Sequence, residues 1–186
     1  MKIKTSGRDD SRSDQYRYLM SRRRIQCWSD WQAAAIYGKV IACWIMGAEK
    51  DVWTFFLSYQ TRCRSVGVEY DSRIYETVCE NKRHAVSGSR TEFVRGNAEN
   101  YVVPAEVDRV FFFNPFSVEI LRKVLAKIED SYYENPREIQ LFFYYPSDEY
   151  ISELMTVDML SFVDEIDCRD LFDGENPRER IMVFAY

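Results

Sequence analysis

A short apolar run in the second half of the chain constrains the fold more than any other feature. Arg109 to Phe116 read R-V-F-F-F-N-P-F. An unbroken apolar run that ends in turn residues is typical of a strand buried on both faces. Pro115 has no N–H to donate to a sheet, so the strand must end before it. Asn114, Pro115 and Phe116 are therefore expected at the carboxyl end of a buried strand, where open α/β sheets bind ligands; a plain strand-to-helix turn is the alternative.

The segments around this run alternate between strand and helix patterns. Strands are predicted at residues 65–70, 91–95, 138–145, 160–168 and 180–184. Helices are predicted after the capping residues Asp71, Ser117 and Ser147. A helical stripe follows Ser117, and its members are Leu121, Val124, Leu125 and Ile128. This alternation predicts a Rossmann-like, doubly wound α/β sheet, mainly parallel with an antiparallel last strand, in a single domain over residues 1–186.

Composition excludes several kinds of site. The net charge of −5 does not favour nucleic acid, although it leaves room for a small basic groove. One histidine and five scattered cysteines give no metal-ligand spacing, so we expect no metal site. The N-terminus is polar, and no apolar run approaches the roughly 20 residues of a membrane span. With an odd cysteine count, these features predict a cytoplasmic protein that does not enter a membrane.

From about residue 65 to the C-terminus, the chain resembles class I S-adenosylmethionine-dependent methyltransferases. More narrowly, it is similar to small bacterial members with a strand-end F-F-F-N-P-F and a following F-F-Y-Y-P strand. The resemblance implies S-adenosylmethionine (SAM) as the cofactor. It places Glu69, in G-V-E-Y-D, on the ribose hydroxyls, with Tyr70 beside it. It also places Asn97 and Ala98 near the adenine, where the family commonly has G-D-A and this chain has G-N-A.

The N-P-F segment is similar to the [DN]-P-P-[YF] motif of methyltransferases that act on planar nitrogens. In those enzymes the Asn side chain and the following carbonyl hold an amino group, while the aromatic ring stacks on the substrate. The resemblance therefore implies Asn114, Pro115 and Phe116 as the catalytic segment, with Asn114 also bordering the cofactor. One proline of the motif is missing here, so neither a nucleic-acid nor a glutamine acceptor is carried over, and the methyl acceptor stays open.

The family's Gly-rich loop, D-x-G-x-G-x-G, is missing from its place before the Glu69 strand. Residues 43–53 instead read C-W-I-M-G-A-E-K-D-V-W, with one glycine. Residues 19–54 also hold all four tryptophans and lack a clear periodicity. We back-translated residues 43–52 and read the degenerate codons with each codon starting one base earlier. This shifted frame permits the sequence V-L-D-Y-G-C-G-K-G-R. The single Trp codon of Trp44 fixes the first base of the aspartate codon in that frame. The same shift at residues 20–32 permits Y-E-P-T-P-Y-S-V-L-E-R-L-A, a capped amphipathic helix.

We therefore predict three segments: a polar N-terminal segment (1–18), an atypical segment translated out of frame (about 19–54) and a family-like remainder (55–186). Side chains in place of the glycines would occupy the space where backbone must approach the cofactor. The chain as written is thus expected to bind SAM poorly, although residues 39–46 are apolar enough to form a first strand. The alternative for residues 19–54 is a divergent segment whose shifted frame matches by chance.

Other interpretations stay open on the sequence alone. The chain is either a methyltransferase or a non-catalytic remnant that serves as a binding domain. A dinucleotide enzyme is a third class, because a glutamate that ends the second strand also suits the ribose of NAD; a last strand parallel to the others would favour it. Five tyrosines line either an acceptor pocket or the core edge: Tyr132, Tyr133, Tyr144, Tyr145 and Tyr150. Five acids form either a metal site or, as we expect, a solvated face: Asp164, Glu165, Asp167, Asp170 and Asp173.

Overall fold

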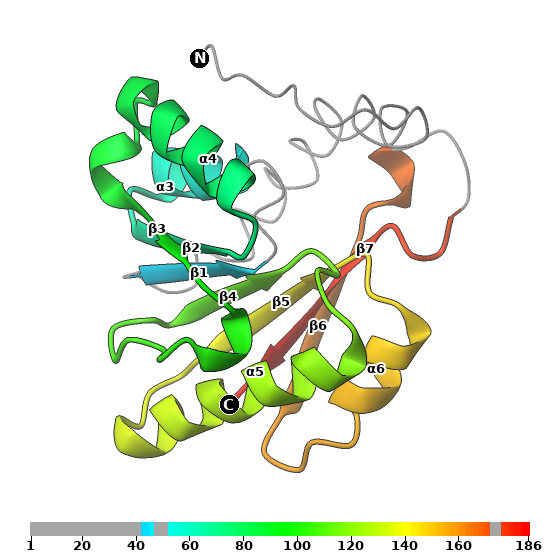
Figure 1. The fold of residues 1–186 in the computed structure, drawn as a ribbon. Coiled ribbons are helices and arrows are strands. Elements are labelled where there is room, and N and C mark those ends of the chain that lie inside the picture. The colour runs from blue at the N-terminus through cyan, green and yellow to red at the C-terminus, as the bar shows by residue number, and fades with distance from the viewer. Residues whose placement is uncertain (1–41, 47–51, 172–175) are drawn as a thin grey trace.

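The computed structural model describes residues 42–46, 52–171 and 176–186, and within them seven strands form one sheet (Figure 1). The strands are Ala42–Met46 (β1), Arg64–Glu69 (β2), Thr91–Arg95 (β3), Arg109–Phe112 (β4), Gln140–Tyr144 (β5), Ser161–Asp167 (β6) and Arg180–Ala185 (β7). The α-helices are Val52–Thr61 (α3), Ser72–His84 (α4), Val118–Glu134 (α5) and Asp148–Leu154 (α6). Three short 3-10 helices are Gly88–Arg90 (η1), Ala98–Asn100 (η2) and Arg169–Leu171 (η3).

The order of the strands across the sheet is β3-β2-β1-β4-β5-β7-β6. The first five pair in parallel, whereas β7 runs antiparallel to both β5 and β6. The prediction of a mainly parallel sheet with an antiparallel last strand is confirmed. The chain leaves β1 toward β2 and β3 and later resumes on the other side of β1 with β4 and β5. The carboxyl ends of β1 and β4 therefore flank a topological switch point.

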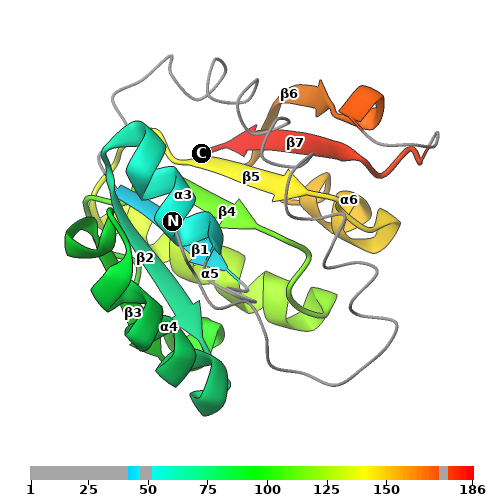
Figure 2. The ribbon, with the colours of Figure 1, turned by 90° about the horizontal axis from the view of Figure 1, so that it is seen from above.

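Helices cover both faces of this sheet, as a doubly wound fold requires (Figures 1 and 2). On one face α5 packs its buried stripe, the four residues predicted from the sequence, against Phe112 and Phe143. On the other face Leu57 of α3 packs with Phe111 and Phe142. Successive phenylalanines of β4 thus face opposite layers, as the pleat of a strand dictates. Across the β4–β5 ladder, Phe111 stacks on Phe142 and Phe112 on Phe143, with ring centroids 4.8 and 4.4 Å apart.

Helix α3 was not predicted from the sequence. Its segment, V-W-T-F-F-L-S-Y-Q-T, lacks the polar face of an ordinary surface helix. Its polar residues Thr54 and Ser58 are fully buried, and Ser58 Oγ donates to the Cys63 carbonyl at 2.7 Å. Its Thr54 carbonyl accepts a hydrogen bond from Ser65 Oγ at 3.1 Å. These tertiary hydrogen bonds explain why a segment with so little sequence periodicity is helical.

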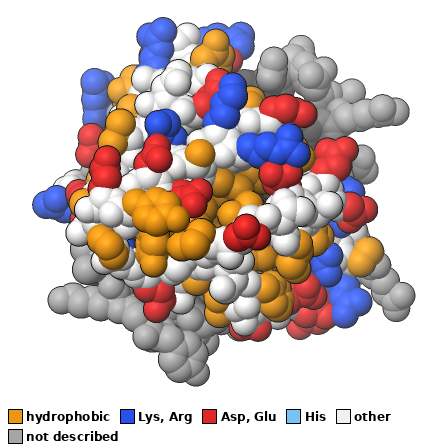
Figure 3. Space-filling model, turned by 90° about the horizontal axis from the view of Figure 1, so that it is seen from below, with side chains coloured by type: hydrophobic (Ala, Val, Ile, Leu, Met, Phe, Trp, Pro, Cys, Tyr) orange, Lys and Arg blue, Asp and Glu red, His pale blue; other side chains and the backbone are white. Residues whose placement is uncertain are grey.

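One interior strand and one edge strand add detail to the predicted sheet. Strand β1 lies inside the sheet, paired with β2 on one side and β4 on the other, and residues 39–41 of the predicted first strand lie outside the described residues. Strand β6 forms an edge, where Phe162 and Val163 are 48% and 51% exposed. On the side of α5 and α6, Figure 3 shows hydrophobic side chains exposed among charged ones.

Within the described ranges, no helix combines the length and the apolar character needed to cross a membrane.

Candidate functional site

The predicted site residues follow the carboxyl ends of neighbouring parallel strands. Glu69 is the last residue of β2, Asn97 comes two residues after β3, and Asn114 comes two residues after β4. Tyr145 comes directly after β5. Because β3, β2, β1, β4 and β5 run in parallel, the structure brings these positions to one edge of the sheet, around the switch point.

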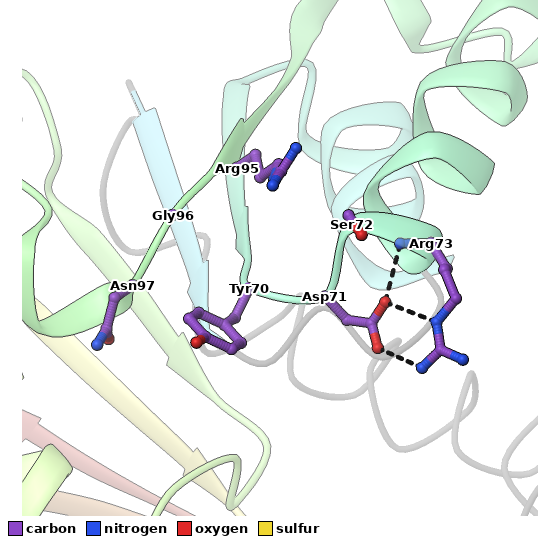
Figure 4. A pocket seen from close by; sticks show the side chains of 7 residues that line it. All are labelled: Tyr70, Asp71, Ser72, Arg73, Arg95, Gly96 and Asn97. Carbon is purple, nitrogen blue, oxygen red and sulfur yellow. Dashed lines mark hydrogen bonds and ion pairs between the residues drawn. The ribbon is translucent and has the colours of Figure 1, made fainter.

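A cavity of about 570 Å³ opens at the β2–β3 part of this edge (Figure 4). Its lining residues are Tyr70, Asp71, Ser72, Arg73, Arg95, Gly96 and Asn97. The Tyr70 side chain is 79% exposed, and in Figure 4 its ring lies between Asn97 and Asp71. The cavity thus offers one exposed aromatic face among polar and charged groups.

Glu69 directly precedes the cavity-lining Tyr70 in the sequence and is held by hydrogen bonds to two other lining residues, Asp71 and Gly96. It is 9% exposed, its Oε1 accepts a hydrogen bond from the Asp71 N–H at 2.7 Å, and its main-chain carbonyl accepts one from Gly96 at 3.0 Å. Asp71 in turn caps α4, as predicted, by accepting from the Arg73 N–H at 2.8 Å. The Arg73 guanidinium, 2.8 Å from Asp71 Oδ2, holds the pKa of the Asp71 carboxyl far below its ordinary value.

Asn97 and Ala98 occupy the turn after β3. The Asn97 amide is bonded on both sides to Glu99: its oxygen accepts from the Glu99 N–H at 3.2 Å, and its nitrogen donates to Glu99 Oε1 at 2.6 Å. Lys123 of α5 lies 2.6 Å from Glu99 Oε2 and lowers the pKa of that carboxyl. Ala98 is buried in the core. The turn therefore has a fixed conformation, and the adenine contact of Asn97 and Ala98 stays a prediction.

The β4 end carries the N-P-F segment. Asn114 is exposed and has a φ of 52°, in the left-handed region that asparagine tolerates better than most residues. Pro115 and Phe116 are half-buried, and Phe116 packs against the core cluster of α5. Just before them, the Phe113 ring stacks on Trp53 of α3 with centroids 5.2 Å apart. The segment thus projects Asn114 outward from a base of packed aromatic rings.

Some features of this edge were not expected from the sequence. Tyr150 of α6 is 1% exposed, and its hydroxyl binds the main chain of Phe116. Tyr145 also has a left-handed φ of 53°, and its hydroxyl accepts a hydrogen bond from Asn176 at 2.7 Å. Of the five tyrosines, Tyr144 and Tyr150 are buried in the core. No local sequence signal identifies these partners, because each depends on how separate elements pack.

Other ionisable groups lie away from the cavity beside Tyr70 or are held in ion pairs. His84 is exposed at the far end of α4, a helix that begins at the site edge and runs away from it. Among the predicted acids, Asp167 pairs with Arg169 and Glu165 with Arg180, and Asp173 lies outside the described residues. The residues that the structure describes contain no group of three or more His, Cys, Asp or Glu side chains able to hold a metal ion.

No protein-family model and no curated protein matches this sequence, but solved structures share its fold. The N-methyltransferase NodS from Bradyrhizobium japonicum WM9 has a TM-score of 0.61 and 13% identity, covering 90% of this chain and 94% of NodS. The glycopeptide N-methyltransferase MtfA, solved with SAM, has a TM-score of 0.64 and 10% identity, covering 86% and 92%. A Streptococcus agalactiae protein of the NADB-Rossmann superfamily has a TM-score of 0.61 and 15% identity, covering 89% and 68%. The chain therefore has the class I methyltransferase fold.

Proposed function

We propose that this chain descends from a SAM-dependent methyltransferase and that its catalytic edge is formed by Glu69, Asn97 and Asn114. The observation that carries the proposal is the parallel order β3-β2-β1-β4, which supports a shared site because these three positions follow strands that end at the same edge. The antiparallel β7 fits the same family. The orientation of β7 also removes the feature that would have favoured a dinucleotide enzyme. The methyltransferase neighbours support the same assignment at the level of the fold.

The described residues fit the nucleoside end of the cofactor. The cavity beside Tyr70 is large enough for a nucleoside, and the carboxylate of Glu69, the residue before Tyr70, has acceptor oxygens of the kind that bind a vicinal diol. We assign the ribose to Glu69, the face of the base to Tyr70, and the edge of the base to the Asn97–Ala98 turn. When bound, SAM supplies an electrophilic methyl group on its sulfonium.

The acceptor is assigned to the N-P-F segment. The exposed Asn114 amide can accept a hydrogen bond from an amino group of the acceptor, and the carbonyl of Pro115 offers a second acceptor atom. Methyl transfer of this kind depends mainly on aligning the nucleophile with the methyl group, so few acid–base residues are needed. The distance of His84 from this edge is therefore compatible with the proposal.

Residues about 19–54 are, in this proposal, the product of two compensating single-base insertions or deletions. They replace the Gly-rich loop with M-G-A-E-K-D-V, a sequence whose side chains would conflict with the close backbone approach that the cofactor's methionine end needs. The nucleotide sequence provides a direct test: it must encode D-Y-G-C-G-K-G in the adjacent frame. The same loop sequence favours a second candidate function for the chain as written, a non-catalytic remnant that keeps the sheet and has lost cofactor affinity.

Isothermal titration with SAM separates these possibilities. For the purified chain we expect a Kd above about 1 mM, and for a frame-restored version a Kd in the micromolar range, a gain of about 4 kcal/mol. In the restored version, Glu69→Gln removes the ribose-binding carboxylate and should weaken binding by about tenfold. Micromolar affinity of the chain as written would contradict the proposed effect of the frame shift. A restored version that fails to bind SAM would contradict the methyltransferase assignment itself.

A further inference from the structure

One buried hydroxyl group holds both polar main-chain groups of Phe116. Tyr150 Oη accepts a hydrogen bond from the Phe116 N–H at 3.1 Å and donates one to the Phe116 carbonyl at 2.9 Å. Tyr150 is 1% exposed and lies 34 residues away in sequence, on the helix that follows β5. Paired in this way, the Phe116 main chain cannot rotate without breaking two buried hydrogen bonds.

We propose that Tyr150 is the positioning residue of the Asn114–Phe116 segment, and that α6 fixes the direction of the Asn114 amide through this hydroxyl. The proposal rests on the function proposed above, in which this segment holds the methyl acceptor. Tyr150 does not face the acceptor itself, because its side chain is buried in the core. It acts through Phe116.

The position of the Tyr150 hydroxyl is itself determined by the core. The Tyr150 N–H donates to the capping Ser147 Oγ at 3.2 Å, and its ring meets Phe143 of β5 edge-on, with centroids 6.3 Å apart. One turn later, Glu153 of α6 forms two hydrogen bonds with the Arg122 guanidinium of α5, at 2.8 and 2.6 Å. Helix α6, which carries the hydroxyl, is therefore fixed by contacts with both the sheet and α5.

The hydroxyl is in the form that can donate and accept at once. A tyrosine is neutral at physiological pH at its ordinary pKa of 10.0, and burial raises the pKa of Tyr150 further, to about 12. A neutral phenol has one O–H to donate and lone pairs to accept, which matches the two bonds to Phe116. Phenylalanine at this position would keep the ring and lose both bonds.

The backbone of Asn114 explains why the segment needs such an anchor. A residue before proline normally adopts an extended conformation, yet Asn114 precedes Pro115 with a φ of 52°. A sparsely populated conformation persists only where its surroundings enforce it. The Phe116–Tyr150 pair is the main-chain anchor that directly follows Pro115, so we assign it this role.

Amide hydrogen exchange on the full chain tests the anchor directly. In Tyr150→Phe we expect exchange of the Phe116 amide to accelerate by about tenfold, with α4 unchanged. Tyr186→Phe is the matched control, because it removes a tyrosine hydroxyl whose contact is a single 3.5 Å bond to the Leu125 carbonyl. It should leave the Phe116 amide unchanged. Unchanged exchange at Phe116 in Tyr150→Phe, or a uniform increase over all helices, would overturn the proposal.

A second measurement asks whether the anchor matters at the acceptor position. In the frame-restored version, Tyr150→Phe should leave the Kd of S-adenosylhomocysteine within about twofold. It should weaken sinefungin, which carries an amine where SAM carries its methyl group, by about fivefold. Equal weakening of both ligands would indicate general destabilisation and overturn the positioning role. If neither ligand binds the restored version, the proposed function fails, whereas the exchange measurement still decides the role of Tyr150.

Discussion

The two halves of the proposed catalytic edge are held together in different ways. At the β2–β3 half, the hydrogen bonds that side chains accept from the main chain join residues two positions apart: Asp71 to Glu69, Arg73 to Asp71, and Glu99 to Asn97. The main-chain bond from Gly96 to Glu69 and the Lys123–Glu99 ion pair are the longer-range contacts of this half. At the β4–β5 half, the bonds join residues more than thirty positions apart. Tyr150 binds Phe116 across 34 residues, and Asn176 binds Tyr145 across 31.

This difference predicts which half of the edge tolerates substitution without loss of the fold and which half does not. The cavity in the β2–β3 half is lined by exposed and half-buried residues, so changes there should alter binding and leave the sheet intact. The β4–β5 half is continuous with the aromatic core, through Phe112, Phe143 and Tyr150. Changes there should alter the fold and the site together.

The largest expected effect is in the β4–β5 half, at Phe112. This side chain is 1% exposed and stacks on Phe143, so Phe112→Ala leaves a cavity and should lower the free energy of unfolding by about 3–5 kcal/mol. Phe162→Ala on the edge strand β6 is the control, because Phe162 is 48% exposed and should lose about 0.5 kcal/mol or less. Urea unfolding measures both. A loss below about 1 kcal/mol at Phe112 would break the comparison.

The same difference explains how much of the molecule could be predicted from sequence. Local signals were reliable: Asp71 caps α4, and all four residues of the α5 stripe are buried. Ser117 also begins a helix, although its side chain makes no capping hydrogen bond. The mainly parallel sheet followed from the alternation of strands and helices.

Contacts that depend on packing between elements could not be predicted in this way. Helix α3 was missed because buried Thr54 and Ser58 replace the polar pattern of a surface helix with tertiary contacts. Placing Phe113, Asn114 and Tyr145 at one edge required only the topology. The Tyr150–Phe116 bonds required the packing of α6 against α5, which no local pattern encodes. The roles of Glu69 and Asn97 depend on a ligand, and stay predictions.

Two glycines near β3, Gly88 and Gly96, should differ in how much stability is lost when each is replaced by alanine. A Cβ at Gly88 would collide with the Lys82 main-chain carbonyl, so Gly88→Ala should lower the free energy of unfolding by about 2 kcal/mol. A Cβ at Gly96, which lines the cavity, would meet no atom within 4 Å, so Gly96→Ala should change stability by less than about 0.5 kcal/mol.

In the frame-restored version, the same Gly96→Ala change should nevertheless weaken SAM binding by about fivefold, because the added methyl group lies where we place the nucleoside. Thermal unfolding and titration of one preparation give both quantities. An unfolded Gly96→Ala protein would show that the β2–β3 half is as tightly coupled to the core as the other half.

The smallest expected effect is electrostatic and lies at Asp71. Its bonds with Arg73 hold the pKa of the Asp71 carboxyl below the ordinary value of 3.8, so the folded state binds a proton there less readily than the unfolded state. The resulting stabilisation is fully present above the ordinary pKa and is lost as the pH falls through the lowered one.

Asp71→Asn retains a side-chain oxygen that can cap α4, and thus isolates the charge. We expect a small decrease in Tm between about pH 5 and 7 that shrinks below about pH 4, as the wild-type carboxylate becomes protonated on unfolding. The Asp167–Arg169 pair at the opposite end of the sheet, where the pKa of Asp167 is lowered to about 2, is retained in both proteins and cancels from the difference. A decrease that is the same at every pH would mean that Asp71 acts through its shape and not through its charge, and the local ion pair would then have no part in holding this half of the edge.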